Sequence, residues 1–193
     1  MEKTFVKPDL FKLTATALLI SIGIVIPNFM PRLTIEPMSF TLASHVVIFL
    51  AMFISPGVAI AVTIGTTFGF FMTGVPIVVV LRAASHLVFV IPGVLFLARV
   101  NKFKFSGLRL RIFSLVIGVI HGLAETIVAI SFFAISPGAD IHGLFRRGAF
   151  IPMMFLMVGL GTLIHSMVDF EIANAIRRVL ERQKHFRQLM EKS

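Results

Sequence analysis

The sequence predicts an all-α integral membrane protein, a single bundle of six transmembrane helices with both termini in the cytoplasm. Of its 193 residues, 57% are hydrophobic and only 14% are charged, and the mean hydropathy is +0.97. Soluble domains contain about 25% charged residues. Because this chain has too few to cover a wet surface, part of its solvent must be lipid. Six helices of about 20 residues each use most of the length, so one membrane domain is expected.

Six apolar segments, separated by turn-forming residues, define the predicted helices. Ser55-Pro56-Gly57 and Pro76 mark two of the turns, and Pro92 predicts a kink inside the fourth segment. The second and third segments are short, so longer neighbours should shield them from lipid. The helices are expected at about residues 13–26, 40–54, 56–72, 76–98, 111–135 and 150–170, followed by a basic cytoplasmic helical extension at 171–193.

The distribution of positive charge predicts the orientation. The connection between the fourth and fifth segments has no acidic residue and contains Arg99, Lys102, Lys104, Arg109 and Arg111. The positive-inside rule places this connection in the cytoplasm, and six helices then bring both termini to the same side. This rule and attraction to anionic lipids account for the net charge of +9, so nucleic acid is not expected as a partner.

The sequence lacks the patterns of several catalytic and cofactor sites. It has no cysteine, which excludes disulfides and thiolate chemistry, and no GxxxxGK[ST] loop for ATP hydrolysis. Ser85 and His86 are adjacent, so on a helix they point about 100° apart and cannot pair. His121 and Glu125 could ligate zinc, but an HExxH pattern and a third ligand are missing. We therefore predict neither an enzyme nor a resident metal or cofactor.

Small residues recur at intervals of three or four along three segments, where they allow helices to approach closely. Packing within the monomer is the first explanation for the third and fifth segments. The first segment has a comparable face near its cytoplasmic end. The recurring small residues are Gly57, Ala61, Gly65 and Gly69 in the third segment, Gly118 and Gly122 in the fifth, and Thr14, Ala17 and Ser21 in the first.

Five ionisable residues lie well inside predicted helices, where they are costly and usually face the bundle interior or a water-filled cavity, and His165 is a sixth, nearer the membrane surface. Arg82 and His86 are four apart and share one helix face, as do His121 and Glu125. At about 1.5 Å per residue, Arg82 lies roughly 9 Å below the outer end of its helix. His86 and Glu125 each lie roughly 15 Å below theirs. His45 is near the outer end of the second helix, so polar groups from three helices fall at compatible depths.

Two interpretations of this convergence are open. Arg82 and Glu125 could form an internal ion pair while the histidines bond to backbone carbonyls. Alternatively, an outward-facing cavity would present the donors of Arg82 to a solute carboxylate, with hydroxyl groups nearby. The predicted solute-binding residues are Arg82, His86, His45, Glu125, His121, Ser44, Thr41 and Ser85.

Four short stretches carry a resemblance to a known family: residues 39–45, 53–57, 65–70 and 81–86. With the length, the six helices and the basic loop, they resemble the substrate-specific S components of energy-coupling factor (ECF) vitamin transporters. The resemblance implies a multi-pass protein of the bacterial plasma membrane that captures a vitamin from outside with high affinity. It also implies partners, namely an ECF transmembrane coupling subunit and two ATPase subunits. ATP would then be used by those partners.

The resemblance also suggests specific surfaces and ligands. The family's AxxxA contact motif on the first helix corresponds to Ala17 and Ser21, and its gating loop to residues 28–39. An intramembrane arginine with histidines suits an anionic vitamin, so pantothenate is favoured and nicotinate comes next. Thiamine and flavin are disfavoured because the chain has no Trp or Tyr to stack on them. The alternative is a stand-alone secondary transporter or channel for a small organic anion, although no inverted repeat is evident.

Overall fold

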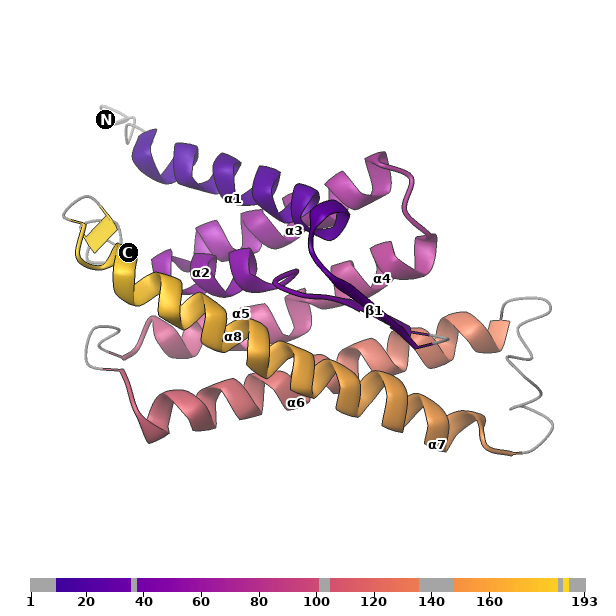
Figure 1. The fold of residues 1–193 in the computed structure, drawn as a ribbon. Helices are drawn as coiled ribbons and strands as arrows, with labels where there is room; N and C mark the ends of the chain where they lie inside the picture. The colour runs from indigo at the N-terminus through magenta and orange to yellow at the C-terminus, as the bar shows by residue number, and fades with distance from the viewer. Residues whose placement is uncertain (1–9, 36–37, 101–104, 136–147, 184–185, 188–193) are drawn as a thin grey trace, which may run out of the picture.

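The computed structural model describes residues 10–35, 38–100, 105–135, 148–183 and 186–187, most of which are helical (Figure 1). The elements are α1 (Leu10–Phe29), β1 (Arg32–Ile35), β2 (Met38–Thr41), α2 (Val46–Ile54), α3 (Pro56–Met72), α4 (Ile77–Ser85), α5 (Leu87–Leu97), α6 (Leu108–Ile135), α7 (Phe150–Met154), the π-helix η2 (Phe155–Leu160) and α8 (Gly161–Leu180). By length and composition, four described helical segments could cross a membrane: Leu10–Phe29, Ile77–Leu97, Leu108–Ile135 and Phe150–Leu180. At this level the predicted class, a helical membrane protein, agrees with the structure.

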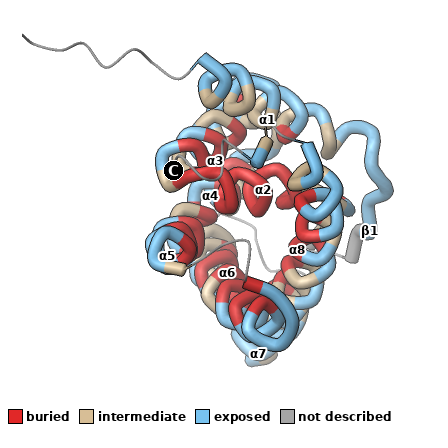
Figure 2. The backbone as a smooth tube through the Cα atoms, turned by 90° about the vertical axis from the view of Figure 1, so that its left-hand side faces the viewer, coloured by how far each residue is buried: buried red, intermediate tan, exposed pale blue. Residues whose placement is uncertain are grey.

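The short helix α2 is the centre of the core. All nine of its residues are buried, and Phe49 and Phe53 pack against Phe170 of α8. In Figure 2, which looks along the bundle, the buried residues of α2, α3, α6 and α8 face inward and the exposed residues face outward. The outward faces carry large apolar side chains such as Leu18 and Leu95. An apolar exterior of this extent fits lipid rather than water.

A β-hairpin occupies the connection between α1 and α2, where a helix was predicted to begin at residue 40. β1 and β2 are antiparallel with Arg32 opposite Thr41, and Arg32 Nε donates to Thr41 Oγ1 at 3.3 Å. Ala43 in the following turn has a φ of 65°, in the left-handed region that a continuing right-handed helix excludes. Helix α2 therefore begins only at Val46, and the predicted loop at 28–39 is the end of α1 and part of the hairpin.

The fourth segment is interrupted at His86, and Pro92, where the sequence suggested a kink, lies inside α5. Ser85 Oγ donates to the carbonyl oxygen of Arg82 at 2.7 Å, and the His86 amide bonds to the Ala83 carbonyl at 3.2 Å. A side chain that competes for a backbone carbonyl in this way weakens the regular helical pattern. The interruption places a buried histidine at the junction of α4 and α5.

The last segment joins α7, η2 and α8 without a loop. π-helices are rare in proteins, and those that occur are often found near functional sites. Helix α8 continues past residue 170 to Leu180, so the first part of the predicted extension at 171–193 is a continuation of this helix. The remainder of that extension from residue 188, together with Lys102 and Lys104 of the basic loop, lies outside the described residues.

Glycines bring helices into close contact within the monomer. A Cβ atom at Gly65 would lie 2.5 Å from Ile20 of α1, and one at Gly122 would lie 2.6 Å from the carbonyl oxygen of Gly159 in η2. A Cβ at Gly57 would meet nothing within 4 Å. The small residues at 65 and 122 therefore serve packing inside the bundle, as the first explanation had it.

Candidate functional site

A pocket of about 210 Å³ lies beneath the β-hairpin, lined by residues of α1, α2, α3, α4, α6 and α8. Six of the eight predicted solute-binding residues line it: Thr41, Ser44, His45, Arg82, His86 and Glu125. The polar lining also includes Arg32 and Ser39 from the hairpin and His165 from α8. The depth estimate from helix spacing therefore brought together the correct helices.

Glu125 of α6 is the centre of the polar network. Its Oε2 accepts hydrogen bonds from Arg82 Nη2 at 2.8 Å and from Thr162 Oγ1 of α8 at 2.6 Å. Its Oε1 lies 3.3 Å from His86 Nε2 and 3.5 Å from His121 Nε2. Glu125 is only 2% exposed, so these partners replace the water that a carboxylate would otherwise need. The internal Arg82–Glu125 ion pair suggested by the sequence is present.

Arg82 is a partly buried cation of the pocket wall, and its side chain is 13% exposed. Its Nη2 is committed to Glu125, but its Nε is buried and has no hydrogen-bond partner among the residues that the structure describes. Buried donors are nearly always satisfied, so an unpaired one on a residue that lines a cavity needs an explanation, and a ligand atom would provide one. The ion pair and the cavity are therefore compatible, and the two interpretations of the sequence do not exclude each other.

Asp169 of α8 binds the turn that precedes α2. It was not among the predicted site residues. Its carboxylate accepts hydrogen bonds from the backbone amides of Ala43 at 2.8 Å and His45 at 2.9 Å. It also lies 3.1 Å from His45 Nδ1 and 3.4 Å from His165 Nε2. These bonds hold the left-handed turn at Ala43. One signal in the sequence could have revealed this pair, because His165 and Asp169 repeat the four-residue spacing of His121 and Glu125.

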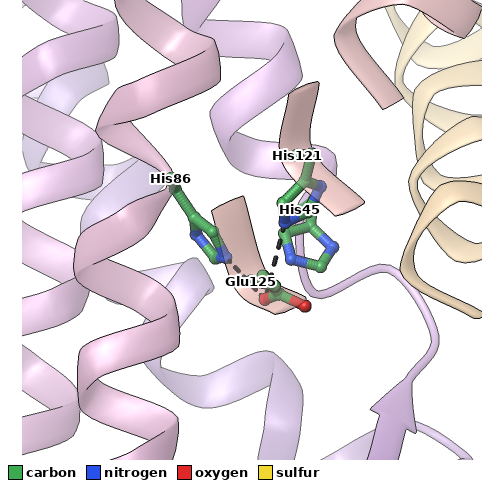
Figure 3. A group of neighbouring side chains, drawn as sticks. All are labelled: His45, His86, His121 and Glu125. Atoms are coloured by element: carbon green, nitrogen blue, oxygen red, sulfur yellow. Dashed lines mark hydrogen bonds and ion pairs between the residues drawn. The ribbon is translucent and has the colours of Figure 1, made fainter. Parts of the chain in front are cut away.

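Three histidines from different helices surround Glu125 (Figure 3). The ring centroids of His45, His86 and His121 are 4.7 to 4.9 Å apart. One ligand atom from each of these three and from Glu125 all lie within 4.8 Å of one another, as do atoms of His45, His165 and Asp169. Among the described residues, these two groups are the ones that could hold a metal ion.

Two predicted solute-binding residues do not line the pocket. The Ser85 hydroxyl is used by the Arg82 carbonyl, and His121 lies behind Glu125 with no exposed surface. Ser44 Oγ, in contrast, lines the pocket 3.1 Å from His165 Nε2. The helical spacing predicted the depth of these residues in the bundle but not which of their side chains line the pocket.

The predicted partner face lies on the outside of α1. Thr14, Ala17 and Ser21 are all exposed. Thr14 Oγ1 and Ser21 Oγ donate to carbonyl oxygens of their own helix, at Leu10 and Ala17. Since these hydroxyls are already satisfied, the face presents a shallow and largely apolar surface to a neighbouring helix.

Comparison with known proteins gives one informative relative. No protein-family model matches the chain, and no solved structure does. The chain is 36% identical over 178 residues to the niacin transporter NiaX of Lactococcus lactis subsp. cremoris (strain MG1363), a match that covers 91% of this chain and 77% of the relative. Because the relative is a transporter, the prediction that the chain is not an enzyme is confirmed. The predicted resemblance is confirmed as well, and the chain belongs to the family of S components of ECF vitamin transporters, of the niacin type.

Proposed function

We propose that this chain captures nicotinate from outside the cell in the pocket beneath the hairpin and delivers it through a shared, ATP-driven module. The relation to a niacin transporter supports the substrate class. The observation that carries the proposal is Arg82, a partly buried cation on the pocket wall whose Nε has no hydrogen-bond partner among the described residues. The carboxylate of nicotinate would accept a charge-assisted hydrogen bond from this donor.

The remaining lining suits a small aromatic acid. Phe40 and Phe70 offer ring faces, and Ser44 and His165 offer polar atoms for a pyridine nitrogen. Pockets for drug-sized ligands usually span about 300–1,000 Å³. A pocket of about 210 Å³ favours a compact, flat molecule over an extended one. Nicotinate therefore takes first place, ahead of pantothenate, the ligand that the sequence alone favoured.

The proposed topology has six membrane segments: α1, α2, α3, α4–α5, α6 and α7–η2–α8. The start of α1, the end of α5, the start of α6 and the end of α8 lie at the same end of the bundle (Figure 1). Exposed Arg99, Arg109 and Arg111 are at this end. The positive-inside rule then places both termini in the cytoplasm of a multi-pass plasma-membrane protein, with the hairpin and the pocket toward the outside.

The proposed partners are the ECF transmembrane coupling subunit and two ATPase subunits. The exposed small-residue face at Thr14, Ala17 and Ser21 supports contact with a coupling helix, because small residues let helices approach closely in lipid. The chain itself carries no ATP-binding loop. ATP would therefore be hydrolysed by the partners.

The test is calorimetric titration of the detergent-purified chain with nicotinate, nicotinamide and pantothenate. We expect nicotinate to bind most tightly, with one molecule per chain and without ATP. Arg82→Ala should weaken binding at least tenfold, because a desolvated charge-assisted contact contributes about 1.5–3 kcal/mol. Arg111→Ala, on an exposed surface, is the matched control.

A second variant separates binding from folding. Arg82→Lys retains a positive charge opposite Glu125 but removes the guanidinium fork, so it should fold normally and still lose affinity. Unchanged nicotinate affinity in a stably folded Arg82→Lys protein would show that Arg82 serves only the ion pair. Uptake of nicotinate by vesicles that contain this chain alone would favour the stand-alone transporter.

A further inference from the structure

At and just behind the floor of the pocket lies a ligand set that the proposed function does not require. His45 at the start of α2, His86 at the α4–α5 junction, and His121 and Glu125 on α6 converge in the bundle interior (Figure 3). All four are buried, and their ligand atoms lie within 4.8 Å of one another. Sequence spacing brings together only His121 and Glu125, and the fold adds the two further imidazoles that a metal site needs.

The distances approach those of a tetrahedral metal site. Zinc–nitrogen and zinc–oxygen bonds of about 2.1 Å place tetrahedral ligand atoms roughly 3.4 Å apart. Glu125 Oε1 lies 3.3 Å from His86 Nε2 and 3.5 Å from His121 Nε2. These two separations match a shared ion, and the remaining ligand-atom separations, all within 4.8 Å, would have to shorten when it binds.

The surrounding hydrogen bonds orient the ligand atoms as outer-shell partners do. His45 Nδ1 lies 3.1 Å from Asp169 Oδ2, which leaves its Nε2 for an ion. Carboxylate–histidine pairs of this kind are typical of metal-ligating histidines. On Glu125, Arg82 and Thr162 occupy Oε2 and leave Oε1 toward the histidines.

His121 gives an independent observation. It has no exposed surface, and within the described part of the chain neither of its ring nitrogens has a hydrogen-bond partner. Buried polar atoms without partners are rare in native proteins and need an explanation. An ion bound through Nε2 would satisfy one of the two and would account for a histidine at a position where an apolar residue would otherwise be cheaper.

Charge also bears on the site. Arg32 and Arg82 balance Glu125 and Asp169, so the pocket and the cluster together carry no net charge when the histidines are neutral. A divalent cation would make this region positive and attractive to an anionic solute.

We propose that His45, His86, His121 and Glu125 bind a divalent transition-metal ion, with Zn²⁺ as the best match to three imidazoles and one carboxylate. The inference goes beyond the proposed function and does not depend on nicotinate being the substrate. The ion lies at the floor of the pocket, where expansion to five ligands would allow a solute carboxylate or ring nitrogen to coordinate it.

The experiment uses the full chain purified in detergent, freed of its affinity tag and treated with a chelator. Zn²⁺ is titrated by calorimetry in the absence of any vitamin, and bound metal is counted by mass spectrometry. We expect one Zn²⁺ per chain at submicromolar affinity, weakened at least a hundredfold in His121→Leu. His121→Leu should remain folded because neither ring nitrogen of His121 makes a hydrogen bond to the described residues.

Several outcomes would overturn the proposal. Failure to bind one Zn²⁺ per chain, or equal Zn²⁺ affinity in His121→Leu and the unmodified chain, would show that the cluster is a hydrogen-bonded group of side chains and not a metal site. Loss of Zn²⁺ in His165→Gln, with His121→Leu unaffected, would move the ion to His45, His165 and Asp169. Nicotinate binding is measured in parallel with and without chelator. Nicotinate binding without any Zn²⁺ binding would refute the metal site alone, and Zn²⁺ binding without any nicotinate binding would refute the vitamin proposal alone.

Discussion

Replacing Gly122 by alanine should disturb the site through the packing of α6 against the π-helix. A Cβ at this position would lie 2.6 Å from the carbonyl oxygen of Gly159, whereas ordinary contacts begin at about 3.4 Å. The two segments must therefore separate by about 0.8 Å, and backbone atoms cannot rotate away as a side chain can. Overpacking of this kind typically costs about 1–3 kcal/mol.

The same displacement should reach the ligand-binding residues, because Gly122 lies between His121 and Glu125 in the sequence. The Thr162–Glu125 hydrogen bond is 2.6 Å long and would be stretched past the usual range by a shift of that size. A loss of about 1.4 kcal/mol at the site corresponds to a tenfold weaker nicotinate complex. We therefore expect Gly122→Ala to lower both thermal stability and affinity.

Far-ultraviolet circular dichroism during heating is the suitable stability assay, since the chain has no Trp, Tyr or Cys for fluorescence methods. Calorimetry provides the affinity. Gly57→Ala is the matched control, because a Cβ there would meet nothing within 4 Å. Equal melting temperatures for the two variants would refute the close approach of α6 to η2.

Three further predictions concern other parts of the molecule. Asp169→Asn should destabilise the chain by about 2 kcal/mol, because the carboxylate accepts hydrogen bonds from two backbone amides in the turn before α2. Thermal melting measures this loss, with Glu171→Gln at an exposed position as the control. Phe40→Ala should speed release of radiolabelled nicotinate about tenfold, since the ring lines the pocket and packs on Gly161. An unchanged release rate would show that the hairpin does not retain the ligand. Ala17→Leu should leave nicotinate binding intact but stop uptake by the assembled complex, and normal uptake would remove α1 from the partner interface.

The part of the site that the sequence predicted follows from local geometry. Arg82 and His86, and likewise His121 and Glu125, share helix faces because their spacing matches the helical repeat. The depth estimate needed only helix ends marked by proline and glycine. These quantities depend on a few neighbouring residues, so the pattern alone was sufficient.

The parts that the sequence missed depend on contacts between distant segments. Helix α2 begins at Val46 because Asp169, more than a hundred residues later, holds the amides of Ala43 and His45. The apolar run from Phe40 onward is compatible with helix or strand, and only that distant carboxylate and the pairing of β1 with β2 decide between them. Whether a polar group faces the cavity or lies behind it also depends on helix rotation, as Ser85 illustrates.

Helix α2 has a consequence for how the chain is made. Its nine residues span roughly 14 Å, about half of the hydrocarbon thickness, so it is a weak stop signal for the insertion machinery on its own. Only Ser55 separates it from α3, so the two must enter the bilayer as one hairpin. Phe49 and Phe53 then lack their contact with Phe170 until α8 has been synthesised. Assembly of the interior is thus completed only after α8 has entered the bilayer, and truncations within α8 should yield inserted but unfolded chains that cellular quality control removes.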